Sequence, residues 1–136
     1  MNISRYFTWK DALYLPQYSR IADVSDGVTD EVRANLIQLF SKMDLIREFI
    51  GVYCIVHVAF RSKEYNKLVG GSPASAHMEG RACDFHFSRK SCDDVRKAIL
   101  DAGKLEELGL RMEDNPGSGW VHLDTKPPIH SRFFKP

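Results

Sequence analysis

Three residues, His77, Asp84 and His122, are the first candidates for chemistry in this sequence. Two imidazoles and one carboxylate form a ligand set that suits Zn²⁺. Three protein ligands leave one position of a tetrahedral ion open, which a catalytic site needs and a structural site lacks. The His-x6-Asp spacing occurs by chance in many proteins, so the pattern alone also allows a solvated loop histidine at position 77 and a core histidine at position 122.

The local sequence predicts which elements hold these three residues. The turn-rich stretch GGSPAS leads into His77. The alternating segment 82–87 predicts a strand that carries Asp84, and the segment 120–124 predicts a strand that carries His122. Because antiparallel neighbours bring side chains of two strands together, we expect the three residues to meet at one edge of a sheet.

The remaining patterns predict the rest of this sheet and the helices that cover it. Capping residues and the helical spacing of apolar residues predict helices over 8–14, 29–51 and 91–103. The β-branched and aromatic segment 53–60 predicts a buried strand, and 109–113 predicts a strand that forms a hairpin with 120–124. We therefore expect an α+β fold, in which a small, mostly antiparallel sheet is backed by helices.

Composition limits the domain count and the class of partner. The 136 residues, 43% hydrophobic and 27% charged, are expected to form one domain over 1–136, because two domains would have too few residues for separate cores. Lys and Arg number 19 against 18 Asp and Glu. This balance gives no reason to expect a nucleic-acid partner. The longest apolar run, 55–60, is too short for membrane insertion. We expect a monomer.

The cysteines and the amino terminus bear on the compartment. Cys54, Cys83 and Cys92 are odd in number and have no CxxC spacing, so we expect free thiols in a reducing compartment. The opening MNISRYFTWKDALY mixes charges and aromatics and lacks the apolar region of a secretory signal. We therefore expect synthesis in the cytoplasm without a signal peptide.

Two longer stretches resemble a known family. They are AFRSKEYNKLVGGSPASAHMEGRACDF and SGWVHLDT, and they are similar to the zinc D-alanyl-D-alanine carboxypeptidase and peptidoglycan endopeptidase family. Many phage-encoded cell-wall peptidases belong to that family, and the Hedgehog signalling domain resembles it in fold. The resemblance runs from about residue 3 to Thr125.

The resemblance implies roles for individual residues. The family's three zinc ligands fall on His77, Asp84 and His122, which were singled out above on chemical grounds. Arg61 matches an arginine that resembles a clamp for a carboxylate or a peptide carbonyl, a task that suits a planar guanidinium. Ser75 matches a position that can hydrogen-bond substrate near the metal.

The general base is less well determined than the ligands. Several branches of the family place an acidic residue three positions before the last ligand, where this chain has Gly119. Other branches carry Leu-x-x-Glu at the end of the preceding strand, which resembles Leu110 to Glu113. Glu113 is therefore the predicted base, with Asp114 second and with Asp124 and His86 after them. His86 shares the strand face of Asp84 and could instead orient a ligand.

The chain also departs from the family pattern at positions that are not ligands. Val58-Ala59-Phe60 replaces the usual Ser-Gly-Tyr before the arginine, and Ala76 replaces a commoner glutamine. These changes remove possible hydrogen bonds to substrate but no metal ligand.

Together, the residues and the resemblance predict a zinc metallopeptidase of phage or prophage type. Its substrate would be an amide bond in peptidoglycan stem or cross-link peptides, cut as a D-Ala-D-Ala carboxypeptidase or as an endopeptidase. It would act on the bacterial cell wall after release or as part of a virion. The alternative is a non-catalytic, zinc-containing protein that binds the cell wall or serves as a virion component, and a carboxylate near the open metal position distinguishes the two.

Overall fold

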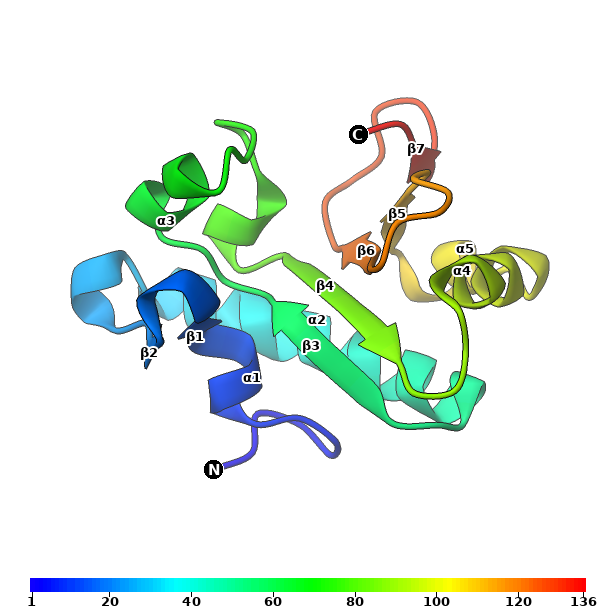
Figure 1. The fold of residues 1–136 in the computed structure, drawn as a ribbon, viewed down its shortest axis with the longest axis horizontal. Coiled ribbons are helices and arrows are strands. Elements are labelled where there is room, and N and C mark those ends of the chain that lie inside the picture. Colours follow the sequence, from blue (N-terminus) through cyan, green and yellow to red (C-terminus); the bar gives the residue numbers. More distant parts are fainter.

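A five-stranded sheet forms the centre of the computed structural model, which describes residues 1–136 (Figure 1). Its strands are β3 (Cys54–Val58), β4 (Ala82–Phe87), β5 (Arg111–Glu113), β6 (Val121–Asp124) and β7 (Phe133–Phe134). They lie in the order β3-β4-β6-β5-β7. All neighbours are antiparallel except β5 and β7, which are parallel. The α+β fold with a mostly antiparallel sheet is therefore confirmed.

The longest helix, α2 (Asp30–Ile50), supplies much of the core. It begins after Thr29, whose hydroxyl accepts the backbone N–H of Val32, and it ends at Gly51 in the left-handed conformation that glycine adopts without strain. Figure 1 shows α2 lying behind β3 and β4. Burying each large apolar side chain contributes about 1.5–3 kcal/mol, and the buried stripe consists of Val32, Leu36, Leu39, Phe40, Met43 and Ile46.

The amino-terminal segment packs against the end of β3. Helix α1 (Trp9–Leu13) starts in a capping box, in which Thr8 and Asp11 satisfy each other's backbone N–H groups. It leads into a two-stranded ribbon of β1 (Tyr14–Leu15) and β2 (Arg20–Ile21), joined by the 3₁₀ turn η1 (Pro16–Tyr18). A second 3₁₀ turn, η2 (Val24–Asp26), precedes α2. The ribbon was not predicted.

Two short helices lie between β3 and β4, and two more lie between β4 and β5. The first two are α3 (Lys63–Leu68) and the 3₁₀ helix η3 (Ala76–Glu79), which carries His77. The second two are α4 (Cys92–Asp101) and α5 (Lys104–Leu108). The prediction of one helix over 91–103 is corrected, because Gly103 has a φ of 65° and starts α5 in a new direction.

The position of the site in the sheet also differs from the prediction. The strands of Asp84 and His122, β4 and β6, are inner neighbours, with β3 on one side and β5 and β7 on the other. The expectation that the site lies at a sheet edge is therefore wrong. The physical reason is that β3 pairs with the outer side of β4 and β5 pairs with the outer side of β6, so both ligand strands have a neighbour on each side.

The three cysteines form no disulfide. Cys54 and Cys83 are buried free thiols, and Cys92 is a half-buried one. Burial raises the pKa of the Cys54 thiol to about 12, so this thiol stays protonated at neutral pH. None of the helices has the length and apolar character that crossing a membrane requires.

Candidate metal centre

His77 is presented by the short helix η3 and is held by backbone groups. Ser75 caps η3, since its hydroxyl accepts the backbone N–H of His77 at 3.2 Å. The imidazole is 3% exposed, and its Nδ1–H donates to the carbonyl of Ala59 at 2.7 Å. This hydrogen bond determines the tautomer and leaves the Nε2 lone pair free. Ala59 stands where the family pattern has a glycine. The hydrogen bond to His77 uses the backbone carbonyl of this residue, so the replacement does not affect it.

Asp84 and His122 face each other across β4 and β6. Their Cα atoms are register partners, and His122 Nδ1 lies 2.9 Å from Asp84 Oδ1. The other ring nitrogen, Nε2, donates to Asp124 Oδ2 at 2.8 Å. Asp124 is fully buried and receives two hydrogen bonds from the Arg111 guanidinium, at 2.8 and 3.0 Å. Asp124 therefore orients His122 so that Nδ1, not Nε2, faces Asp84.

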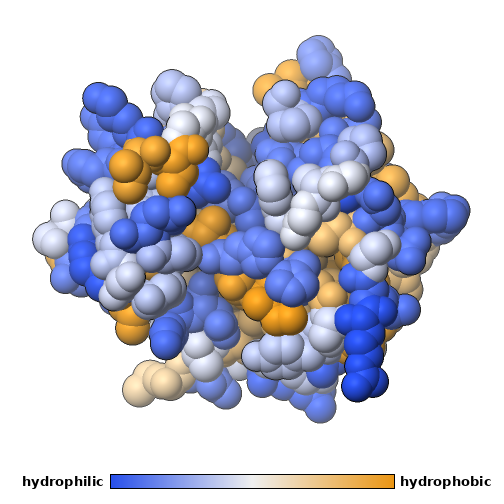
Figure 2. Space-filling model, viewed as in Figure 1, coloured by the Kyte–Doolittle hydropathy of each residue, from blue (hydrophilic) through white to orange (hydrophobic).

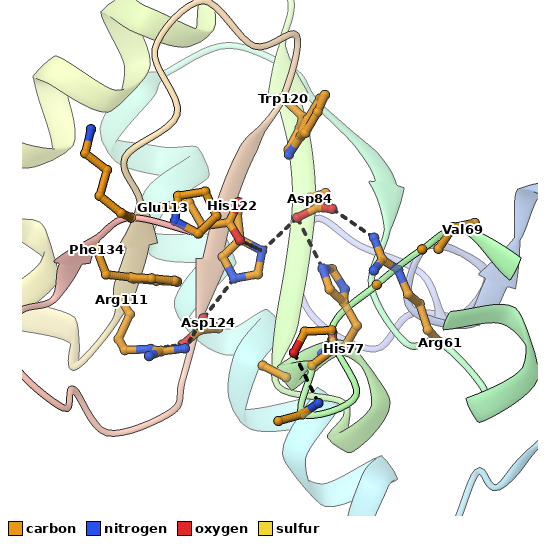
Figure 3. Close-up of a pocket in the computed structure, with 18 residues that line it drawn as sticks. Arg61, Val69, His77, Asp84, Arg111, Glu113, Trp120, His122, Asp124 and Phe134 are labelled. Atoms are coloured by element: carbon orange, nitrogen blue, oxygen red, sulfur yellow. Dashed lines mark hydrogen bonds and ion pairs between the residues drawn. The ribbon is translucent and has the colours of Figure 1, made fainter. Parts of the chain in front are cut away.

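The three predicted ligands converge on one point. One ligand atom from each of His77, Asp84 and His122 lies within 4.8 Å of the others, and His77 Nε2 is 3.3 Å from Asp84 Oδ1 (Figure 3). Both histidines use their other ring nitrogen for a hydrogen bond to the protein. Two nitrogens and one oxygen that are already oriented in this way fit the donor set of a catalytic Zn²⁺ site.

The electrostatics of the cluster favour a bound positive charge. Burial alone would raise the pKa of Asp84, but His77 and His122 beside it lower this pKa far below the usual range. Burial alone would lower the pKa of His122, but hydrogen bonds to Asp124 and Asp84 outweigh it and raise the pKa to about 10. A cation at this point, whether a proton or a metal ion, is therefore stabilised by buried carboxylates.

The three residues of the cluster line a cavity of about 520 Å³. The space-filling view shows the surface notched between the part of the molecule that holds α3 and the part that holds β7 (Figure 2). In the close-up, Arg61 and Glu113 lie on opposite sides of Asp84, and Trp120 lies above it (Figure 3). Ser75 and Phe134 also line the cavity. A substrate in this cavity would therefore contact both the cluster and the residues around it.

Arg61 is positioned by the loop that contains the two adjacent glycines. Its guanidinium lies 3.4 Å from both Asp84 Oδ2 and Asn66 Oδ1. Asn66 in turn donates to the carbonyl of Ser72 at 2.9 Å. A Cβ atom at Gly71 would lie only 2.1 Å from Asn66 Oδ1 and 3.0 Å from Arg61 Nη1. Gly71 is therefore required for the close approach that holds the arginine beside the cluster.

Of the four carboxylate and imidazole candidates for the base, only Glu113 lines the cavity without a side-chain hydrogen bond. Glu113 Oε2 lies 3.8 Å from His122 Nδ1. Asp114 points elsewhere and forms an ion pair with Lys135 at 2.7 Å. Asp124 is occupied by Arg111 and His122, as described above. His86 lies against His57, not against a ligand, so the suggestion that it orients one is corrected in favour of Asp124.

Two residues of the site were not identified from the sequence. The Arg111 guanidinium holds Asp124 and lies over the Phe134 ring, 4.2 Å from its centroid. Phe134 also packs edge-on against His122, with 6.2 Å between ring centroids. Alternation along the strand places Arg111 on the same face as Glu113, which was a usable signal. Phe134 had none, because its place depends on the pairing of β7 with β5.

Comparisons with known proteins add one match. The family model described as Peptidase M15 matches residues 17–124, which is more than three quarters of the chain and includes all three residues of the cluster. A search of curated proteins finds no match.

Proposed function

Because the chain belongs to the peptidase M15 family, a family of zinc-dependent peptidases, we propose that it hydrolyses an amide bond in peptidoglycan stem or cross-link peptides, as a phage or prophage cell-wall peptidase. The observation that carries this proposal is the cluster of His77, Asp84 and His122, which lines a cavity together with the carboxylate of Glu113. The bond is either the terminal D-Ala-D-Ala bond or one inside the stem or cross-link.

We assign the metal to these three side chains. His77 would bind through Nε2, His122 through Nδ1 and Asp84 through a carboxylate oxygen, since these are the atoms that face one another. When bound, Zn²⁺ supplies a Lewis acid that polarises the scissile carbonyl and acidifies water. Asp124 and the Ala59 carbonyl keep the two imidazoles in the required tautomers.

Glu113 is the proposed general base. Its carboxylate lies beside the Nδ1 atom of His122 and borders the cavity, so it can accept a proton from a water molecule placed over the cluster. The same oxygen can then give this proton to the nitrogen that leaves when the amide bond breaks. The proton thus passes from water to the amine product, and Glu113 returns to its starting state.

Arg61 and Ser75 are the proposed substrate contacts. The Arg61 guanidinium borders the cavity and makes only two long contacts, at 3.4 Å, so it retains donors for a carboxylate or carbonyl of the stem peptide. The hydroxyl of Ser75 accepts from the backbone of η3, which leaves its O–H free to donate towards substrate.

The position of Glu113 also supports a peptidase over a non-catalytic wall-binding or virion protein. A protein that only binds does not need a carboxylate beside the metal ligands that lacks a side-chain hydrogen bond and has its nearest charged partner, His122 Nδ1, 3.8 Å away. The two carboxylates with structural partners, Asp114 and Asp124, are held by Lys135 and Arg111. Glu113 is left available for proton transfer.

Digestion of purified peptidoglycan, followed by mass spectrometry, tests the proposal. A carboxypeptidase releases free D-Ala, whereas an endopeptidase separates cross-linked peptides. The Glu113→Gln variant should lose about 10²–10⁴ in rate while it keeps its metal, because it cannot accept a proton. The matched variant Asp114→Asn should change the rate much less. A wild-type protein that binds zinc and cell walls but releases no fragment would show a binding protein instead.

A further inference from the structure

A second pair of histidines, outside the metal centre, lies on the same sheet. His57 in β3 and His86 in β4 approach each other, with 2.6 Å between His57 Nε2 and His86 Nδ1. The rings are close to edge-on, with 4.9 Å between centroids. Neither ring forms a hydrogen bond with His77, Asp84 or His122. The proposed hydrolysis therefore does not involve this pair.

The backbone shows how the two rings come together. His86 pairs with Ile55, and His57 lies two residues further along β3, so the two histidines are diagonal neighbours on one sheet face. The regular pairing is interrupted here, because the register shifts by one residue between Val56 and Val58, after which Val58 pairs with Asp84. A register shift of this kind is a β-bulge. Bulges change the direction of a side chain and are common beside functional sites. The shift places His57 as the extra residue, next to His86.

The pair is open to solvent, as a metal-binding site requires. His57 is exposed and His86 is half-buried. His57 borders a cavity of about 480 Å³, which shares Arg61, Asp84 and Trp120 with the cavity over the metal centre. An ion bound by the two imidazoles would therefore have room for water ligands in its remaining positions.

From this geometry we propose that His57 and His86 form a second binding site, for a divalent late transition metal. Imidazole nitrogen is a preferred ligand of Cu²⁺, Ni²⁺ and Zn²⁺ and a poor ligand of Mg²⁺ and Ca²⁺. Bonds of about 2.0–2.1 Å to a tetrahedral ion place two nitrogens about 3.3 Å apart. The rings need to separate by less than about 1 Å, which rotation of the exposed His57 ring allows. With only two protein ligands, the site binds more weakly than the three-ligand centre.

The order of affinities follows from ligand chemistry. Nitrogen sites bind Cu²⁺ more tightly than Ni²⁺ or Zn²⁺. The second site therefore binds Cu²⁺ most tightly, binds Zn²⁺ when that ion exceeds one equivalent, and does not bind Mg²⁺. This site is independent of the proposed hydrolysis, because it uses neither the ligands nor the base assigned there.

The test is a metal titration of the full chain, followed by calorimetry and by metal analysis after gel filtration. Protein that already carries one equivalent of Zn²⁺ is titrated with Cu²⁺, and the electron paramagnetic resonance spectrum reports the nitrogen ligands. Because Cu²⁺ can also replace zinc at the three-ligand centre, copper counts as bound to the second site only where the metal analysis still finds one equivalent of zinc. Wild type should bind one further equivalent, with two nitrogens on the ion. Each of His57→Gln and His86→Gln should weaken this second event by about tenfold or more. The matched control His130→Gln removes the histidine of the carboxyl-terminal segment and should leave it unchanged.

The outcomes separate this site from the metal centre. If wild type binds no second equivalent, or if both glutamine variants bind it as wild type does, the pair is only a hydrogen bond between two imidazoles and the proposal is overturned. If the His77–Asp84–His122 centre proved unable to hold zinc, wild type would still bind one ion that His57→Gln weakens. Failure of the proposed function and failure of the second site therefore give different results.

Discussion

The second ring nitrogen of each ligand histidine determines which nitrogen faces the metal centre. His77 uses Nδ1 to donate to a backbone carbonyl, and His122 uses Nε2 to donate to Asp124. The two histidines therefore present different nitrogens to the same point. The sequence could not have shown this difference, since both residues are simply His in the chain.

Tight zinc binding should depend on each of the three ligands. His77→Ala, Asp84→Ala and His122→Ala should each abolish stoichiometric zinc binding, because two remaining ligands hold the ion far more weakly. His130→Ala, a change outside the cluster, should keep one equivalent. Metal analysis of the purified proteins at limiting zinc measures this, and a cluster variant that holds one equivalent as tightly as wild type does would remove that residue from the ligand set.

Replacement of Asp124 should weaken metal binding less than replacement of a ligand does. In Asp124→Asn the side chain can no longer act as a charged acceptor for His122 Nε2–H or as the ion-pair partner of Arg111. Loss of such a partner typically weakens metal affinity by about 10–100-fold. Competition with a chromogenic chelator measures the dissociation constant. Asp114→Asn, on the same hairpin but paired with Lys135, is the control, and equal affinities of the two variants would contradict the assigned role.

Among the elements, η3 depends most on a close contact with another part of the chain. Its C-cap, Gly80, has a φ of 73°, and a Cβ atom there would lie 2.8 Å from the backbone oxygen of Val32 in α2. The absence of a side chain at this position lets η3 lie against α2. Because His77 lies on η3, this contact also positions His77 relative to the sheet.

Gly80→Ala is therefore expected to damage both stability and the metal centre. The left-handed conformation alone costs an alanine about 1–2 kcal/mol, and the clash with α2 adds to this. Gly27→Ala is the matched control, because Gly27 also has a positive φ, 92°, but has open space around a Cβ atom. Denaturant unfolding should show the larger loss for Gly80→Ala, and only this variant should lose zinc affinity. Equal losses would show that backbone strain, not packing against α2, is the cause.

The carboxyl-terminal strand β7 completes the site from outside the matched family region. It adds to the sheet through backbone hydrogen bonds at Met112 and Asp114, both of 2.7 Å, and brings Phe134 against Arg111 and His122. The family model matches residues 17–124. The wall of the cavity that Phe134 forms therefore lies outside the matched region.

For the whole molecule, the metal ligands connect segments that are far apart in the sequence. η3, β4 and β6 contribute one ligand each, and the ligand set does not exist in the unfolded chain. Zinc binding should therefore stabilise the folded state by mass action, by about 2.7 kcal/mol at a free concentration of 100 times the dissociation constant.

Removal of the metal should accordingly lower the melting temperature. For a chain of this size, the loss of such a stabilisation corresponds to a shift on the order of 10 °C. Differential scanning calorimetry with and without a chelator measures the shift. The His77→Ala variant, which lacks a complete ligand set, should melt at the same temperature in both conditions. A wild-type melting curve unchanged by chelator and by added zinc would contradict the link between binding and folding.

The sequence by itself determined the features that depend on near neighbours. The capping residues Thr8 and Thr29 are satisfied within three positions, and the apolar stripe of α2 follows from a repeat of 3.6 residues. The types of the ligands also predict their chemistry wherever they lie, and the motif around His77 indicates the family. These properties need no knowledge of which segments meet.

The tertiary structure alone decided the features that depend on contacts between distant segments. Pairing of Asp84 with His122, the contact of Arg111 with Asp124, the place of β7 and the meeting of His57 with His86 all depend on strand register. A shift of one residue would turn each of these side chains to the other face of the sheet. Register results from the packing of the whole core, so the spacing of residues within one segment cannot determine it.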